Sequence, residues 1–113
     1  MLIKNNEMKT EIRNKMRGGD GGIKLKHYVS ADKIPNGRLM ADITIPVDCS
    51  IGTHEHKSET EYYIILSGIG EVNEDGKIYS VSAGDVVVTH DATHGIKNSG
   101  KTDLRMIAVI ING

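Results

Sequence analysis

Residues 52–70 read G-T-H-E-H-K-S-E-T-E-Y-Y-I-I-L-S-G-I-G and combine a metal-ligand pattern with a strand pattern. His54 and His56 occupy alternate positions, and alternate side chains of an extended strand point to the same face. Glu61 opens the next apolar run, and it can bring a carboxylate to the same point if the intervening segment turns. Two imidazoles and a carboxylate suit a divalent transition metal. The stretch therefore predicts a small β-barrel built around one metal ion.

The composition limits both the size and the kind of the core. A chain of 113 residues is long enough for one domain and one modest core. There is no Phe and no Trp, so the core is expected to be aliphatic with a few Tyr. The 13 glycines favour many tight turns over long helices.

Charge and hydropathy argue against several classes of partner. The formal net charge is -1 with acidic and basic residues interspersed, so we expect no nucleic-acid partner. No apolar run is long enough to span a bilayer, and the first residues lack the apolar core of a secretory signal, so we expect no membrane partner. The single cysteine, Cys49, leaves no internal disulfide and fits a cytoplasmic protein.

The first 22 residues are expected to form an N-terminal arm that ends in a glycine-rich turn. Met8, Ile12 and Met16 lie four apart, which allows a short amphipathic helical turn, but equally an arm against the barrel or a partner subunit. We favour the arm. Residues 18–22, G-G-D-G-G, then break any regular element, and residues 23–113 are expected to form the barrel.

The rest of the chain reads as about eight to ten short strands. Alternation predicts strands over 23–29 and 39–47, Asp75-Gly76 predicts a hairpin turn, and the runs 62–66, 86–88 and 104–111 are apolar on both faces. Residues 90–94 read as a polar turn with two more histidines. Close strand spacing with glycine-rich turns predicts an all-β fold, a single closed antiparallel jelly-roll barrel.

Strand alternation also predicts which residues face the metal cavity. If Glu61 points at the metal, Tyr63 and Ile65 share its face and line the same cavity. His27 lies on the more apolar face of its strand, where a packing role is favoured over a ligand role.

The pattern resembles the cupin family, in particular small single-domain bacterial cupins of the oxalate-decarboxylase-like subgroup. The first cupin motif is a His-x-His pair, a Glu four or five positions on, and then a Gly. His54, His56, Glu61 and Gly68 match it in full. The second motif is matched by Gly84, Asp85, His94 and Asn98, although His90 stands where Pro is usual and Ala92 where Gly is usual.

The resemblance implies four metal ligands, His54, His56, Glu61 and His94. His90 is an alternative for the fourth position, but the spacing to Asn98 favours His94. Ligating imidazoles usually donate their second N–H to a neighbour, and Asn98, Tyr63 and His90 are the residues considered for the surroundings of the ligands. The implied cofactor is one divalent transition metal, with Mn or Fe favoured and Zn, Ni, Co or Cu compatible with the same ligands.

Three functions follow from this site. The favoured one is a metal-dependent enzyme, decarboxylase-like or dioxygenase-like, that acts on a small carboxylate or oxygenated metabolite. The first alternative is a metal and small-ligand binding or sensing module without turnover. The second is a sugar-phosphate isomerase-like enzyme, which requires a basic cluster near the barrel mouth that the sequence does not reveal. The resemblance also implies a homodimer.

Overall fold

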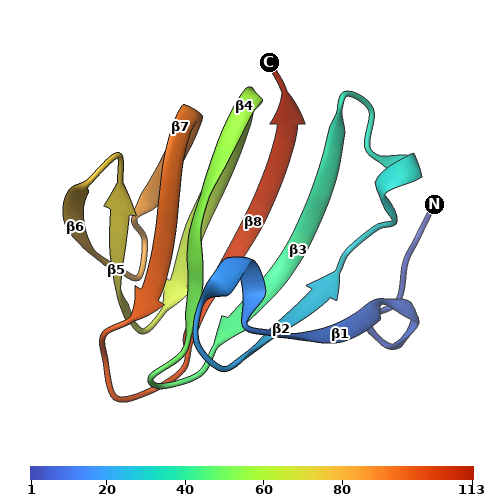
Figure 1. The fold of residues 1–113 in the computed structure, drawn as a ribbon. Coiled ribbons are helices and arrows are strands. Elements are labelled where there is room, and N and C mark those ends of the chain that lie inside the picture. Colours follow the sequence, from blue (N-terminus) through green and yellow to red (C-terminus); the bar gives the residue numbers. More distant parts are fainter.

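The alternating apolar residues form eight strands that pair into one antiparallel sheet in the computed structural model, which describes residues 1–113 (Figure 1). The strands are β1 (Lys9–Asn14), β2 (Gly22–His27), β3 (Gly37–Ile45), β4 (Ser50–Ser67), β5 (Ile69–Glu74), β6 (Lys77–Ser82), β7 (Val86–Asn98) and β8 (Leu104–Asn112). Three short 3-10 helices, η1 (Asn5–Glu7), η2 (Met16–Gly18) and η3 (Ala31–Lys33), complete the chain. The prediction of an all-β antiparallel fold is confirmed.

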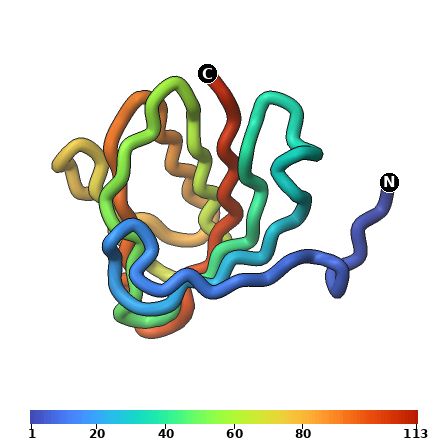
Figure 2. The backbone as a smooth tube through the Cα atoms, turned by 45° about the vertical axis from the view of Figure 1, so that its right-hand side comes forward, coloured from blue at the N-terminus to red at the C-terminus, as the bar shows by residue number.

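The sheet is rolled rather than flat. Its strand order is β1-β2-β3-β8-β4-β7-β5-β6, so the two edge strands, β1 and β6, are not hydrogen-bonded to each other. Curvature encloses the core because β4 and β7, the two longest strands, rise together, fold over at the top and descend again (Figure 2). The predicted hairpin is present between β5 and β6, where Asp75 and Gly76 both have positive φ, at 49° and 86°.

The core is aliphatic, as the composition predicts. Its one aromatic member is Tyr63, and the remainder is built mainly from isoleucine, leucine, valine and alanine on the inner faces of the strands. Fully buried side chains include those of Ile23, Leu25, Ala41 and Ile45. Polar side chains are buried beside this core, among them His56, Glu61 and His94.

The N-terminal segment adds a strand to the sheet. β1 pairs with β2 in antiparallel register, and Glu11 accepts a hydrogen bond from His27 of β2 at 2.7 Å. The alternative helical turn over residues 8–16 does not form, because these residues are extended up to Asn14. None of the three 3-10 helices approaches the length and apolar character that crossing a lipid bilayer requires.

A matched bend in β4 and β7 replaces the turn expected at residues 90–94. Ser58 and Asp91 have positive φ, at 59° and 45°, and the Ser58 backbone N–H donates to Asp91 Oδ1 at 2.7 Å. Each bend changes which residues point inward: His56 is buried before the bend of β4, and Glu61 and Tyr63 are buried after it. Strict alternation would place His56 and Glu61 on opposite faces. The bend therefore brings them to the same side.

The bend predicts how substitutions at Ser58 change the free energy of unfolding. Ser58→Val should lower the free energy of unfolding by about 1–3 kcal/mol, because a β-branched residue is strained at positive φ. Ser58→Gly should stay within about 1 kcal/mol of the wild type, since glycine adopts this conformation freely. Urea unfolding of the two variants measures both values. Equal stability of Ser58→Val and Ser58→Gly would contradict the role given to this bend.

Candidate metal centre

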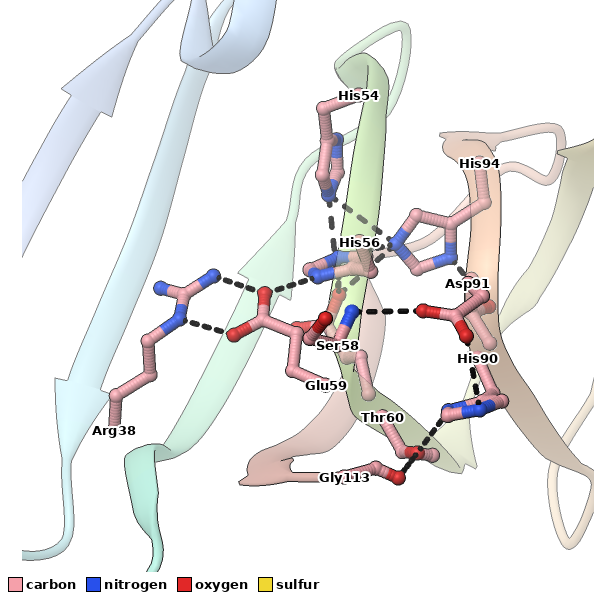
Figure 3. A network of polar contacts seen from close by, with 12 residues as sticks. Arg38, His54, His56, Ser58, Glu59, Thr60, His90, Asp91, His94 and Gly113 are labelled. Atoms are coloured by element: carbon pink, nitrogen blue, oxygen red, sulfur yellow. Dashed lines mark hydrogen bonds and ion pairs between the residues drawn. The ribbon is translucent and has the colours of Figure 1, made fainter.

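Four side chains from three strand segments converge inside the roll. His54 and His56 come from β4 before its bend and His94 from β7 (Figure 3). Glu61 comes from β4 after the bend. Each offers one ligand atom, and the four atoms lie within 4.8 Å of one another. His56, Glu61 and His94 are buried, and the His54 side chain is 9% exposed. The structure thus brings together the four residues that the cupin resemblance implies as ligands.

The distances between these atoms fit a single metal ion. His94 Nε2 lies 3.0 Å from His56 Nε2 and 3.2 Å from His54 Nε2. Glu61 Oε1 lies 2.9 Å from the Nε2 atoms of both His56 and His94, and 3.9 Å from that of His54. Ligands about 2.1 Å from an ion lie roughly 3.0 Å apart when adjacent and roughly 4.2 Å apart when opposite. The set therefore has the dimensions of a coordination shell.

Each imidazole is oriented through its other nitrogen. The Nδ1 atoms of His54, His56 and His94 lie 2.8 Å from Gly52 O, 2.7 Å from Glu59 Oε1 and 2.8 Å from Thr89 Oγ1, respectively. A carbonyl and a carboxylate accept hydrogen bonds, and a hydroxyl can do so. With Nδ1–H donated outward, every Nε2 presents its lone pair to the shared centre, which is the arrangement of metal-binding histidines.

Glu59 is the main site residue that sequence reasoning missed. Its carboxylate receives two hydrogen bonds from Arg38 of β3, at 2.8 and 2.7 Å, and one from His56 (Figure 3). The hydrogen bonds from Arg38 and then His56 outweigh burial and lower the pKa of Glu59 to about 2. Glu59 therefore remains an anion beside His56. The only sequence signal was an acidic residue three positions after that histidine, whereas Arg38 lies on a separate strand.

The electrostatics of the cluster keep its carboxylate ionised. Burial raises the pKa of Glu61, but the contacts with His54, His56 and His94 more than offset it, so the pKa is lowered. The contact with Glu61 chiefly raises the pKa of His56, whereas burial lowers the pKa of His94. A buried anion faced by imidazole nitrogens is a favourable environment for a cation.

Tyr63 borders the cluster, whereas Ile65 lies in the core. The Tyr63 ring stacks on His94, with centroids 5.1 Å apart and an interplanar angle of 12°. Burial, followed by the charge of Glu61, raises the pKa of Tyr63 well above its usual value, so the phenol stays protonated. Ile65 points to the same side but packs in the core, outside the lining of the cavity.

Asn98 and His90 lie away from the cluster. Asn98 donates to the carbonyls of Ile45 and Thr102 and accepts from the Gly100 N–H, so it fastens the loop before β8. All of its side-chain hydrogen bonds go to this region, and none goes to a member of the cluster. His90 is exposed at the bend and bonds Thr60 at 2.9 Å. It is therefore not the fourth member of the cluster.

A cavity of about 590 Å³ leads to the cluster. His54, His56, Glu61 and Tyr63 line its inner part, and the N-terminal segment, β2 and β3 line the rest. Five basic residues border it, a group that the sequence did not reveal because its members are spread over four segments: Lys9, Arg13, Arg17, Lys33 and Arg38. Glu7, Glu11 and Glu61 also line the cavity, so its basic residues outnumber its acidic ones.

The rolled antiparallel sheet and its three-histidine, one-carboxylate cluster define a cupin. The cupin domain model matches residues 41–110, and the chain belongs to this family.

Comparison with individual proteins gives close and distant relatives. The chain is 39% identical to an oxalate-binding protein of Thermotoga maritima, with 98% of this chain and 93% of that protein covered. It is also similar to the crystal structure of a predicted oxalate decarboxylase from Thermotoga maritima, with a TM-score of 0.93, 37% identity and full coverage of both chains. A putative sugar phosphate isomerase from Acidithiobacillus ferrooxidans has a TM-score of 0.79 at 23% identity, with 99% and 75% coverage, and shares the fold.

The contact between Glu59 and His56 predicts an effect on metal affinity. Glu59→Gln keeps the size of the side chain but removes the charge that holds the Nδ1 proton of His56, so affinity for Mn²⁺ should fall about tenfold or more. Chelator competition measures this change. Glu55→Gln, at an exposed position on the same strand, serves as the control and should leave the affinity unchanged. Equal affinities for the two variants would show that Glu59 does not support the site.

Proposed function

We propose that this chain binds one divalent transition metal through His54, His56, Glu61 and His94, and at that metal a small carboxylate of the oxalate class. The observation that carries this proposal is the convergence of three Nε2 atoms and one carboxylate oxygen, with every Nδ1 already bonded elsewhere. Mn and Fe are the favoured metals, since both accept mixed imidazole and carboxylate ligands.

The charge of the site explains the preference for an anion. Three neutral imidazoles and one carboxylate leave a divalent ion with net positive charge, and the bound metal would supply a Lewis acid for oxygen donors. Four protein ligands leave one or two positions for such a donor in five- or six-coordinate geometry. The cavity reaches His54, His56 and Glu61, so a ligand entering there meets the cluster directly. Similarity to an oxalate-binding protein over nearly the whole chain supports the same ligand class.

Binding without turnover is the function that the cavity supports best. Decarboxylation of oxalate breaks the C–C bond, releases CO₂ and requires a proton on the remaining carbon to give formate. Among the carboxyl groups that line the cavity, Glu61 belongs to the cluster and Glu11 is bonded to Arg13 and His27. The remaining carboxyl group, that of Glu7, is exposed on η1. Since this is the one group left to deliver the proton, turnover is the second candidate function.

The function is tested on protein purified without added metal. We expect about one Mn or Fe per chain, and oxalate binding by calorimetry that requires the metal. His54→Ala should lose both metal and oxalate binding, whereas the control His90→Ala, an exposed histidine outside the cluster, should keep both. Formate release in the same samples distinguishes turnover from binding alone. Protein that carries no metal, and whose stability is unchanged by His54→Ala, would contradict the proposal.

A sugar phosphate is the remaining candidate ligand. The basic residues around the cavity supply the charge that this alternative requires, although the similarity to a putative isomerase extends to the fold alone. Titration with a hexose 6-phosphate beside oxalate compares the two ligands. Tighter binding of the sugar phosphate would replace the oxalate proposal.

We also propose that the chain is a homodimer. The outer face of β4 and β7 carries an apolar surface in which Ile64 lies opposite Val86, and Leu66 and Val88 extend it along the two strands. Their exposed fractions are 36% for Ile64, 40% for Leu66, 55% for Val86 and 51% for Val88. A contiguous apolar surface on a soluble domain indicates an interface, and a second copy can bury it through the same residues.

Light scattering tests the assembly and its interface. The wild type should have the mass of two chains at micromolar concentration, and Val88→Lys should reduce it to one. Ile12→Lys, which alters an apolar residue that is 58% exposed on β1, is the control and should remain dimeric. A dimer lost in Ile12→Lys and kept in Val88→Lys would place the interface at β1 instead.

A further inference from the structure

Three arginines border the cavity, and two of them are already paired. Arg13 bonds Glu11 at 2.7 Å, and Arg38 bonds Glu59 through two nitrogens. Arg17 lines the same cavity and forms no ion pair. Its guanidinium therefore has all of its donors available for a ligand.

The backbone of Arg17 is fixed against the metal-facing strand. Arg17 lies in η2 with φ of 55°, a conformation that is strained for a non-glycine residue. Its carbonyl packs so closely on Gly52 that a Cβ atom at position 52 would lie 2.1 Å from it. The carbonyl of Gly52 in turn accepts the hydrogen bond from His54 Nδ1. Arg17 thus contacts Gly52, the residue to which His54 is hydrogen-bonded.

The turn that carries Arg17 is held by backbone hydrogen bonds. Lys15 N–H donates to Gly21 O, Gly18 N–H to Lys15 O, and Gly19 N–H to Met16 O, each at 2.9 Å. These bonds close the turn, and the Ser50 N–H of β4 donates to Asp20 O at 2.9 Å, which ties the turn to that strand. A basic side chain on a fixed turn loses less conformational freedom when it binds a ligand.

We propose that Arg17 binds the second carboxylate of a dicarboxylate ligand whose first carboxylate lies at the His54–His56–Glu61–His94 cluster. This inference rests on the proposed function and adds to it the residue that selects dicarboxylates over monocarboxylates. The planar guanidinium can donate two parallel hydrogen bonds to one carboxylate, whereas lysine offers only a compact charge. Removing the guanidinium leaves the far carboxylate in the cavity without that partner.

Calorimetry with Mn²⁺-loaded protein tests the role of Arg17, with oxalate and formate as probes. Arg17→Gln should weaken oxalate binding about tenfold or more, since a hydrogen-bonded charge is lost, and should leave formate binding and Mn²⁺ affinity unchanged. Arg17→Lys should bind oxalate with intermediate affinity. Lys15→Gln removes the same charge from the same turn at a residue outside the cavity lining, and it should behave as the wild type.

The outcomes separate this inference from the proposed function. If Arg17→Gln binds oxalate within twofold of the wild type, or weakens formate equally, Arg17 does not bind the second carboxylate and the metal-site function stands. A loaded wild type that binds oxalate no more tightly than formate also overturns the inference alone. If the loaded wild type binds neither anion, both the proposed function and the role of Arg17 are wrong. Circular dichroism of each variant verifies that η2 substitutions leave the sheet intact.

Discussion

The structure depends on the close approach of three imidazole nitrogens and one carboxylate oxygen away from water. Lone pairs at separations near 3 Å repel one another unless a proton or a metal ion lies between them. The surrounding residues make this approach possible because Gly52, Glu59 and Thr89 bond the outer nitrogen of each ring. Tyr63, which belongs to the buried core and stacks on His94, joins the site to that core. The hydrogen bonds of the Nδ1 atoms therefore set the positions of the Nε2 atoms, which are the candidate ligands.

Position in the chain controls the site as strongly as residue type. His56 and Glu61 lie an odd number of positions apart, so a regular strand would point them in opposite directions. Ser58 and Asp91, each at positive φ and joined by a hydrogen bond, reverse the inward face of β4 and β7 at the same level. The paired bends also roll the sheet. Fold and site therefore arise from one local irregularity shared by two neighbouring strands.

The sequence predicted the strands, the aliphatic core and the four clustered residues, because apolar alternation and the His-x-His pattern are local signals. It predicted a turn at residues 90–94, where β7 continues through a bend. Polar residues such as Asp91 occur both in turns between strands and in bends within a strand, so the sequence pattern does not distinguish the two. It placed Asn98 beside the ligands, whereas Asn98 fastens a loop. The links from Arg38 to Glu59 and from Arg17 to Gly52 join distant segments, and no local pattern records such contacts.

The position of Glu61 beyond the bend has a mechanical consequence. Because β4 supplies ligands from both of its limbs and β7 supplies one, an ion at the cluster would cross-link three segments of the roll in the manner of a staple. Binding to the folded state alone increases its stability in proportion to the logarithm of metal concentration over Kd. The fold-over of β4 would gain most, since its strained residue, Ser58, lies between the ligands His56 and Glu61. Metal supply would then set how tightly this end of the barrel is held, independently of any chemistry performed there.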